Sequence, residues 1–196
     1  MANSRGLNPL ARFVITVFLW LPVTFAVWYF TAPVLLWPAA LTIRLIAKLG
    51  LSDLVRSIEA NGGTLVFLTT LRPGQAIGNA FISVDVNLLI YSFGLPLFAA
   101  LTLAAHEARW PRILAIGYAI SLPFVVWGAL AEFLRTAAIA SGPQIAAQAG
   151  FAAWQRELIA FAYQFGSLIL PAVVPAVLFV VLHRRYLERI RRTTAP

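Results

Sequence analysis

Two histidines are the side chains of this chain best suited to bind a metal ion, and they lie far apart in the sequence. His106 is followed by Glu107 in a short polar segment, and His183 begins a basic tail. A metal site needs several convergent ligands, and the chain has no cysteine that would supply more. We therefore expect no metal site, no cofactor and, without cysteine, no disulfide or thiol nucleophile.

Hydroxyl and carboxylate groups give no clearer catalytic arrangement. Ser92 and Ser121, like the other serines of the apolar segments, have no nearby histidine or lysine that would activate a nucleophile. Glu132 and Arg135 are three residues apart, so on a helix they share one face as an interfacial charge pair. Such a pair either grips a partner or substrate or simply closes the end of the helix. We predict no catalytic residues.

The segments of the chain that contain these residues are too apolar for a water-soluble domain. Hydrophobic residues make up 61% of the 196 residues and charged residues 11%, against roughly 45–50% and about 25% in soluble proteins. The charges gather at the chain ends and between long apolar segments, which is typical of a polytopic membrane protein. Because a helix needs about 20 apolar residues to cross a bilayer, we predict four spans. They are residues 13–37, 88–105, 113–134 and 161–182, of which the second is the shortest.

The long loop at residues 38–87 is expected to be structured. Pro38 opens a short helix that ends near Gly50. One face of this helix carries an apolar stripe suited to the membrane surface, formed by Leu41, Leu45, Ile46 and Leu49. β-branched or alternating sequence at residues 54–58, 64–70 and 80–86 predicts two or three short strands around an Asn-Gly-Gly turn. The expected fold is a single membrane domain over residues 1–196, an all-α four-helix transmembrane bundle with a small extracytoplasmic β-containing subdomain.

The distribution of arginine and lysine predicts the orientation. Nine of the 15 basic residues, Arg5 among them, lie on the side that holds both termini and the turn at residues 106–112, and six lie on the other side. The positive-inside rule therefore places both termini in the cytoplasm and the long loop outside it.

Basic residues are densest in the C-terminal tail, which follows an apolar segment directly. The tail contains Arg184, Arg185, Arg189, Arg191 and Arg192. Beside a span, such arginines retain the tail in the cytoplasm and attract anionic lipid at about 1 kcal/mol per basic residue. We therefore expect membrane lipid, and not nucleic acid, as the partner of this tail, despite a net charge of +8.

The junction between the long loop and the second span is the best candidate for contact with another protein. Its residues combine hydrogen-bonding groups, a small residue that permits close approach, and a kink. They are Asn87, Tyr91, Ser92, Gly94 and Pro96. The alternative is that the same residues form a structural hinge that joins the loop to the helix.

Three stretches of the sequence resemble the exosortase H-associated membrane proteins, small bacterial inner-membrane proteins linked to the exosortase sorting system. They are Phe18-Leu19-Trp20-Leu21-Pro22 near the N-terminus, residues 63–70 in the loop, and above all residues 86–97 at the junction. Exosortases themselves resemble multi-span cysteine transpeptidases that act on C-terminal sorting signals with Cys, Arg and His. Since this chain has no cysteine, the resemblance implies a non-catalytic accessory that binds a membrane protein, with no family catalytic residues to carry over.

Two other function classes stay open from the sequence. A lipid-substrate enzyme or lipid carrier would use the outer charges Glu132, Arg135, Arg156 and Glu157. A small channel would need polar or charged groups inside the spans, and the centres of the four predicted spans carry no charge. Of these classes, the sequence favours the accessory.

Overall fold

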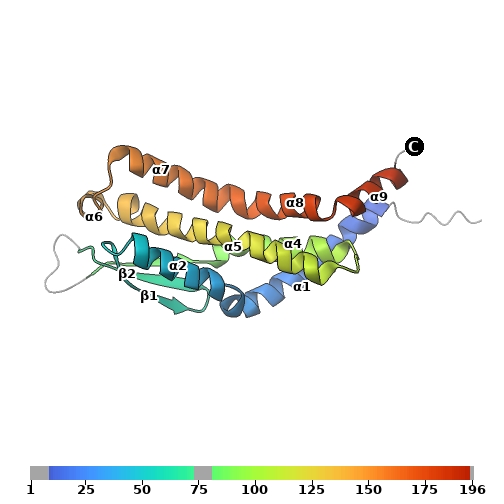
Figure 1. The fold of residues 1–196 in the computed structure, drawn as a ribbon, viewed down its shortest axis with the longest axis horizontal. Helices are drawn as coiled ribbons and strands as arrows, with labels where there is room; N and C mark the ends of the chain where they lie inside the picture. The colour runs from blue at the N-terminus through green and yellow to red at the C-terminus, as the bar shows by residue number, and fades with distance from the viewer. Residues whose placement is uncertain (1–8, 73–80, 195–196) are drawn as a thin grey trace, which may run out of the picture.

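The computed structural model describes residues 9–72 and 81–194, with the side chains of residues 193 and 194 left out (Figure 1). Two parts of the sequence-based predictions lie outside the described residues. They are Arg5, one of the nine basic residues counted on the side of the termini, and residue 80, the first residue of the third expected strand. The rest of the loop between residues 72 and 81 also lies outside them.

Three helices are long and apolar enough to cross a membrane. The first is α1 (Pro9–Leu35). The second is α5 (Trp110–Arg135), which continues through a π-helical turn, η1 (Thr136–Ala140). The third joins α7 (Ala153–Gln164), the π-helical turn η2 (Phe165–Ile169) and α8 (Leu170–Leu182) into one helix of 30 residues. At 1.5 Å per residue that helix is about 45 Å long, so it extends well beyond a hydrocarbon core of roughly 30 Å.

The second predicted span is shorter than the other three. It consists of α3 (Leu89–Ser92) and α4 (Gly94–Ala104), which meet at Phe93. Together they form an apolar helical segment about 24 Å long, less than the roughly 30 Å of a hydrocarbon core. The four-helix transmembrane bundle predicted from sequence is therefore not confirmed, and the structure provides three candidate spans plus this shorter helix.

The long loop forms a helix and a three-stranded antiparallel sheet. Helix α2 (Trp37–Gly50) has the predicted bounds to within a residue. The strands are β1 (Val55–Asn61), β2 (Thr64–Thr69) and β3 (Ser83–Asn87), hydrogen-bonded in the order β1-β2-β3. The β1–β2 hairpin turns at Gly62, whose φ of +60° is a conformation that glycine adopts without strain. The prediction of a small sheet is thus confirmed.

A common core joins this sheet to α2 and α5. The rings of Phe67 on β2 and Phe133 on α5 stack with centroids 4.4 Å apart, and both are fully buried. Helix α2 buries Ile43 and three alanines in the same core. Its opposite face is exposed, and that face contains the stripe predicted from sequence, with exposures from 40% at Ile46 to 77% at Leu49.

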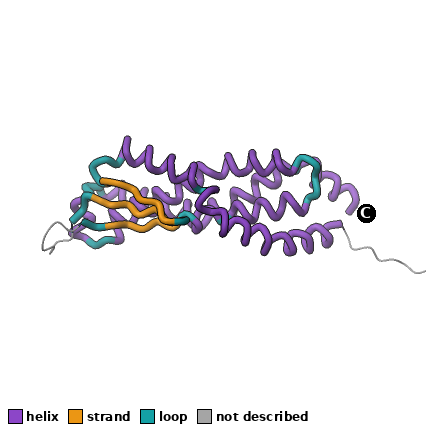
Figure 2. The backbone as a smooth tube through the Cα atoms, turned by 90° about the horizontal axis from the view of Figure 1, so that it is seen from below, coloured by secondary structure: helices purple, strands orange, loops and turns teal. Residues whose placement is uncertain are grey.

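The two ends of the elongated molecule differ in structure. The sheet, α2 and the short helix α6 (Pro143–Gln148) lie at one end (Figure 1), and Figure 2 shows the strands side by side at that end. The beginning of α1, the turn after α4 and the final helix α9 (Arg184–Thr194) lie at the other (Figure 1). The first and last described residues are therefore at the same end of the helical bundle.

Candidate functional site

Asn87 connects the sheet to the first turn of α3. It is the last residue of β3, and its Oδ1 accepts a hydrogen bond from the backbone N–H of Leu89 at 3.0 Å. The backbone N–H of Leu88 donates to the carbonyl of Gly63 at 2.9 Å. An asparagine that bonds to the backbone two residues on ends a strand and begins a turn, so this residue fixes how the helix leaves the sheet.

Tyr91 fastens α3 to α5. Its side chain is 4% exposed, and its hydroxyl donates a hydrogen bond to Oε2 of Glu132. The ring lies against Gly128, where an added Cβ would come within 2.2 Å of Cδ1 of Tyr91. A side chain at position 128 would therefore displace the ring, and glycine at this position permits the contact.

Tyr91→Phe is expected to lower the free energy of unfolding by about 1.5–3 kcal/mol, because it removes a hydrogen bond to a carboxylate. The measurement is thermal unfolding in mild detergent. Tyr29→Phe removes the same hydroxyl from a residue that is 60% exposed, and it should leave the melting temperature nearly unchanged. Equal melting temperatures for the two variants would show that the Tyr91 bond contributes nothing.

Gly94 brings α4 into close contact with α8. A Cβ at this position would lie 2.5 Å from the carbonyl oxygen of Pro171. Pro175 lies four residues further along α8 and has no N–H to donate to that carbonyl. Ser92 and Pro96, on either side of the contact, are buried as well. The small residue and the prolines therefore serve packing between two helices of the same chain.

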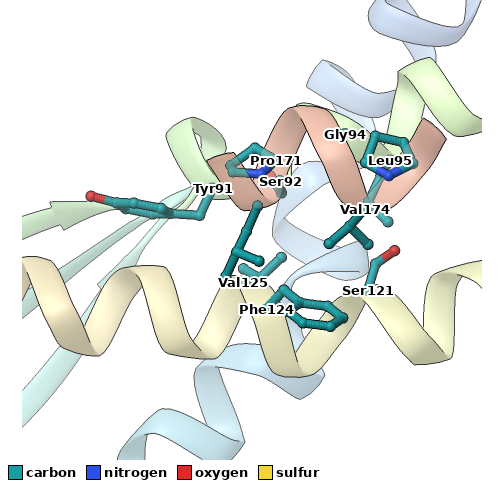
Figure 3. A pocket seen from close by; sticks show the side chains of 11 residues that line it. Tyr91, Ser92, Gly94, Leu95, Ser121, Phe124, Val125, Pro171 and Val174 are labelled. Atoms are coloured by element: carbon teal, nitrogen blue, oxygen red, sulfur yellow. The ribbon is translucent and has the colours of Figure 1, made fainter. Parts of the chain in front are cut away.

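A cavity of about 20 Å³ remains where the junction meets α5 and α8 (Figure 3). Tyr91, Ser92 and Gly94 line one side, and Ser121 and Pro171 lie on the other two helices. The hydroxyl oxygen of Ser92 is buried and has no hydrogen-bond partner within the described part of the chain. The cavity has room for a single water molecule. It is far too small for a lipid or peptide substrate.

The five junction residues are thus brought together, but mostly turned inward. Tyr91, Ser92, Gly94 and Pro96 are buried, and Asn87 is partly exposed. Within this segment the large exposed side chain is Ile90, at 47%. Their geometry agrees with the hinge interpretation, and a role in partner binding stays a prediction.

The predicted outer charge pair is arranged differently from a simple ion pair. Glu132 accepts the hydrogen bond from Tyr91, while the guanidinium of Arg135 lies 4.5 Å from the ring centroid of Tyr163 on α7. In the part of the chain that the structure describes, ion pairs within 4.0 Å involve Glu107 and not Glu132. Arg156 and Glu157 are exposed on α7. The outer charges therefore tie α3, α5 and α7 together and do not converge on one cleft.

The sequence did not predict a polar network at the end of the molecule that holds α9. His183 is 1% exposed, and its Nδ1 lies 3.0 Å from Oε2 of Glu107 while its Nε2 lies 3.3 Å from Oγ1 of Thr102. Arg189 donates to Oε1 of Glu107 at 3.2 Å. Glu107 and His183 were considered from sequence only as metal ligands, whereas here they join the turn after α4 to the start of α9.

The charges of this network also act on a neighbouring tyrosine. Burial raises the pKa of Tyr186 on α9 above its usual value, Arg189 lowers it by a smaller amount, and Glu107 raises it. The phenol therefore stays neutral at physiological pH. Over residues 9–72 and 81–194, no group of three or more histidine and carboxylate side chains comes together to hold a metal.

The fold and the junction define a small helical membrane protein with three candidate transmembrane helices and a sheet at one end. The exosortase H-associated membrane protein family matches residues 7–186, nearly the whole chain, and this chain belongs to that family. No curated protein and no solved structure matched it. The resemblance found in the three sequence stretches is thereby confirmed.

Proposed function

We propose that this protein is a non-catalytic accessory of the bacterial inner membrane that binds an exosortase-type sorting transpeptidase. The family match carries this proposal, because the family is described as associated with exosortase H. The arrangement of polar side chains supports it. In the described residues Glu107, Glu132 and both histidines hydrogen-bond within the fold, and the buried Ser92 and Ser121 line a cavity the size of one water molecule.

The proposed topology has four crossings, with α3 and α4 together as the second. Both termini then face the cytoplasm, and the sheet with α2 faces the periplasm. The charge count supports this orientation, and so does the position of α1's beginning, the turn after α4 and α9 at one end of the molecule (Figure 1). A crossing of about 24 Å is accommodated where the bilayer thins locally or where neighbouring helices cover the segment.

The absence of cysteine from the sequence makes this topology directly testable. Ser57→Cys places a thiol on exposed β1, and Ala108→Cys places one in the exposed turn after α4. In intact spheroplasts a membrane-impermeant maleimide should label position 57, and it should label position 108 only after the membrane is permeabilised. The reverse pattern would contradict the orientation, and labelling of both positions in intact spheroplasts would contradict the single crossing, by α3 and α4, between them.

The contact with the exosortase is proposed at the junction of sheet and helix. Asn87 and Ile90 supply the partly exposed surface there, while the buried residues Tyr91 and Gly94 hold that surface in place. A contact that combines the apolar Ile90 with the polar Asn87 suits association in a membrane, where close packing and interhelical hydrogen bonds drive binding.

The proposal is tested by purifying the protein from native membranes in a gentle detergent and identifying the bound proteins and lipids by mass spectrometry. We expect an exosortase in stoichiometric amount. A protein that emerges alone, with one enriched lipid whose retention depends on Glu132 and Arg135, would contradict the proposal and favour a lipid carrier.

A further inference from the structure

A groove of about 860 Å³ lies at the end of the molecule that holds α9. It is bounded by the turn after α4, the first turns of α5, the end of α8 and the start of α9. Five arginines line it, namely Arg109, Arg112, Arg184, Arg185 and Arg189. The sequence separates the first two from the others by more than 70 residues, so their convergence is a property of the fold.

The His183 network explains why these arginines meet. His183 lies between α8 and α9, and its bond to Glu107 holds the start of α9 beside the turn that leads to α5. Arg189 bonds to the same carboxylate. For the other four arginines, the described residues place no carboxylate within 4.0 Å. The N-terminus of α5, with its partial positive charge, adds to the same potential.

The groove wall nearest the spans is aliphatic, and His106, Glu107 and Ala108 of the turn complete the lining. Ile113, Ile116 and Val181 line it on the side of the spans, and Val181 is 54% exposed. Trp110 is 44% exposed beside Arg109 and Arg112, as expected for an aromatic ring at a membrane interface. The groove thus has a cationic part next to the end of the spans and an apolar part along them. A soluble phosphate would use only the first of these, whereas a phospholipid uses both.

We propose that this groove binds an anionic phospholipid of the surrounding bilayer. The phosphate lies among Arg109, Arg112, Arg184 and Arg185, and one acyl chain lies along Ile116 and Val181. Several arginines around one groove favour a lipid with two phosphates over a lipid with one, because basic pockets between membrane helices hold such head groups. This site rests on the proposed placement of α5 and α8 in the membrane and does not depend on the exosortase.

The test measures lipid binding by the purified full-length protein in a non-ionic detergent. The probes are cardiolipin, phosphatidylglycerol, phosphatidylcholine and inorganic phosphate, and binding is followed by native mass spectrometry. The variant R112Q/R185Q removes two arginines from the groove. The matched variant R191Q/R192Q removes two exposed arginines from the last turn of α9, outside the groove lining.

We expect cardiolipin to bind most tightly and R112Q/R185Q to weaken it roughly 25-fold, at about fivefold per arginine. R191Q/R192Q should change the affinity by less than about twofold, because the detergent offers no charged bilayer surface and exposed charge outside the groove is screened by salt. Phosphatidylcholine and inorganic phosphate should compete poorly. If R112Q/R185Q fails to insert or fold, R112K/R185K keeps the charge and should still weaken binding severalfold, since lysine lacks the bidentate geometry of arginine.

Several results would contradict the proposed lipid site. Equal losses in the two double variants would indicate diffuse attraction to the whole tail. Binding of phosphatidylcholine as tight as that of cardiolipin would indicate ordinary boundary lipid, and displacement of cardiolipin by inorganic phosphate at similar concentration would indicate a soluble anion site. Failure of the exosortase to copurify would leave the lipid result untouched, so the two proposals fail separately.

Discussion

Replacing Phe133 by alanine should lower the free energy of unfolding by about 3–5 kcal/mol, more than any other single substitution considered for this chain. The ring is fully buried and stacks on Phe67 at 4.4 Å, with the two planes 17° apart. It joins the sheet to α5, so its removal leaves a cavity where the loop subdomain meets the helices. We expect the sheet to separate from the helices at lower temperature than the helices themselves unfold.

The measurement combines thermal unfolding in detergent with limited proteolysis of the sheet. Phe161→Ala is the matched control, because Phe161 also stacks on another ring, that of Phe165, but is 65% exposed. The control should lose little stability, since its side chain faces detergent or lipid in both states. Similar losses for the two variants, or proteolysis that is unchanged in Phe133→Ala, would show that the stacked pair does not hold the subdomain in place.

Gly94→Ala is expected to cost about 1–3 kcal/mol through overpacking. The new Cβ would meet the backbone oxygen of Pro171 at 2.5 Å, and backbone does not move aside as a flexible side chain does. Helices α4 and α8 must then separate, and the junction surface around Ile90 should shift with them. We therefore expect less copurified exosortase as well as a lower melting temperature.

Gly50→Ala serves as the control for this substitution. It adds the same methyl group at the end of α2, where the new Cβ would have no heavy atom within 4 Å beyond its own chain neighbours and helix backbone. The control should leave both stability and copurification near those of the natural protein. If Gly94→Ala behaves like Gly50→Ala, then α4 and α8 do not depend on close approach at this point.

Local sequence patterns were sufficient to predict the sheet. Strands β1, β2 and β3 follow from alternation and from the Asn61-Gly62-Gly63 turn, because one face of the sheet packs on α2 and α5. The continuity of α7 with α8 was not predicted. Arg156 and Glu157 are polar enough to suggest a separate segment, yet they lie on the exposed part of a helix longer than the bilayer is thick.

The inward orientation of the junction could not be predicted from sequence. In a membrane the buried and lipid-facing sides of a helix are both apolar, so hydrophobic periodicity does not tell them apart. The contacts that decide it are long-range, from Tyr91 to Glu132 and from Gly94 to Pro171. The bond between Glu107 and His183 is also long-range, so local sequence patterns could not predict it. For the same reason they could not predict that the arginines converge at the other end of the molecule.

Photo-crosslinking in native membranes tests whether the protein binds the exosortase through the junction. A photoreactive amino acid at position 90 would lie on the exposed junction, and one at position 120 on α5 provides a control, since Ile90 and Ile120 are 47% and 42% exposed. We expect position 90 to crosslink to the exosortase and position 120 to do so weakly or not at all. Absence of an exosortase adduct at position 90, with the protein present at normal levels, would contradict the proposed association through the junction.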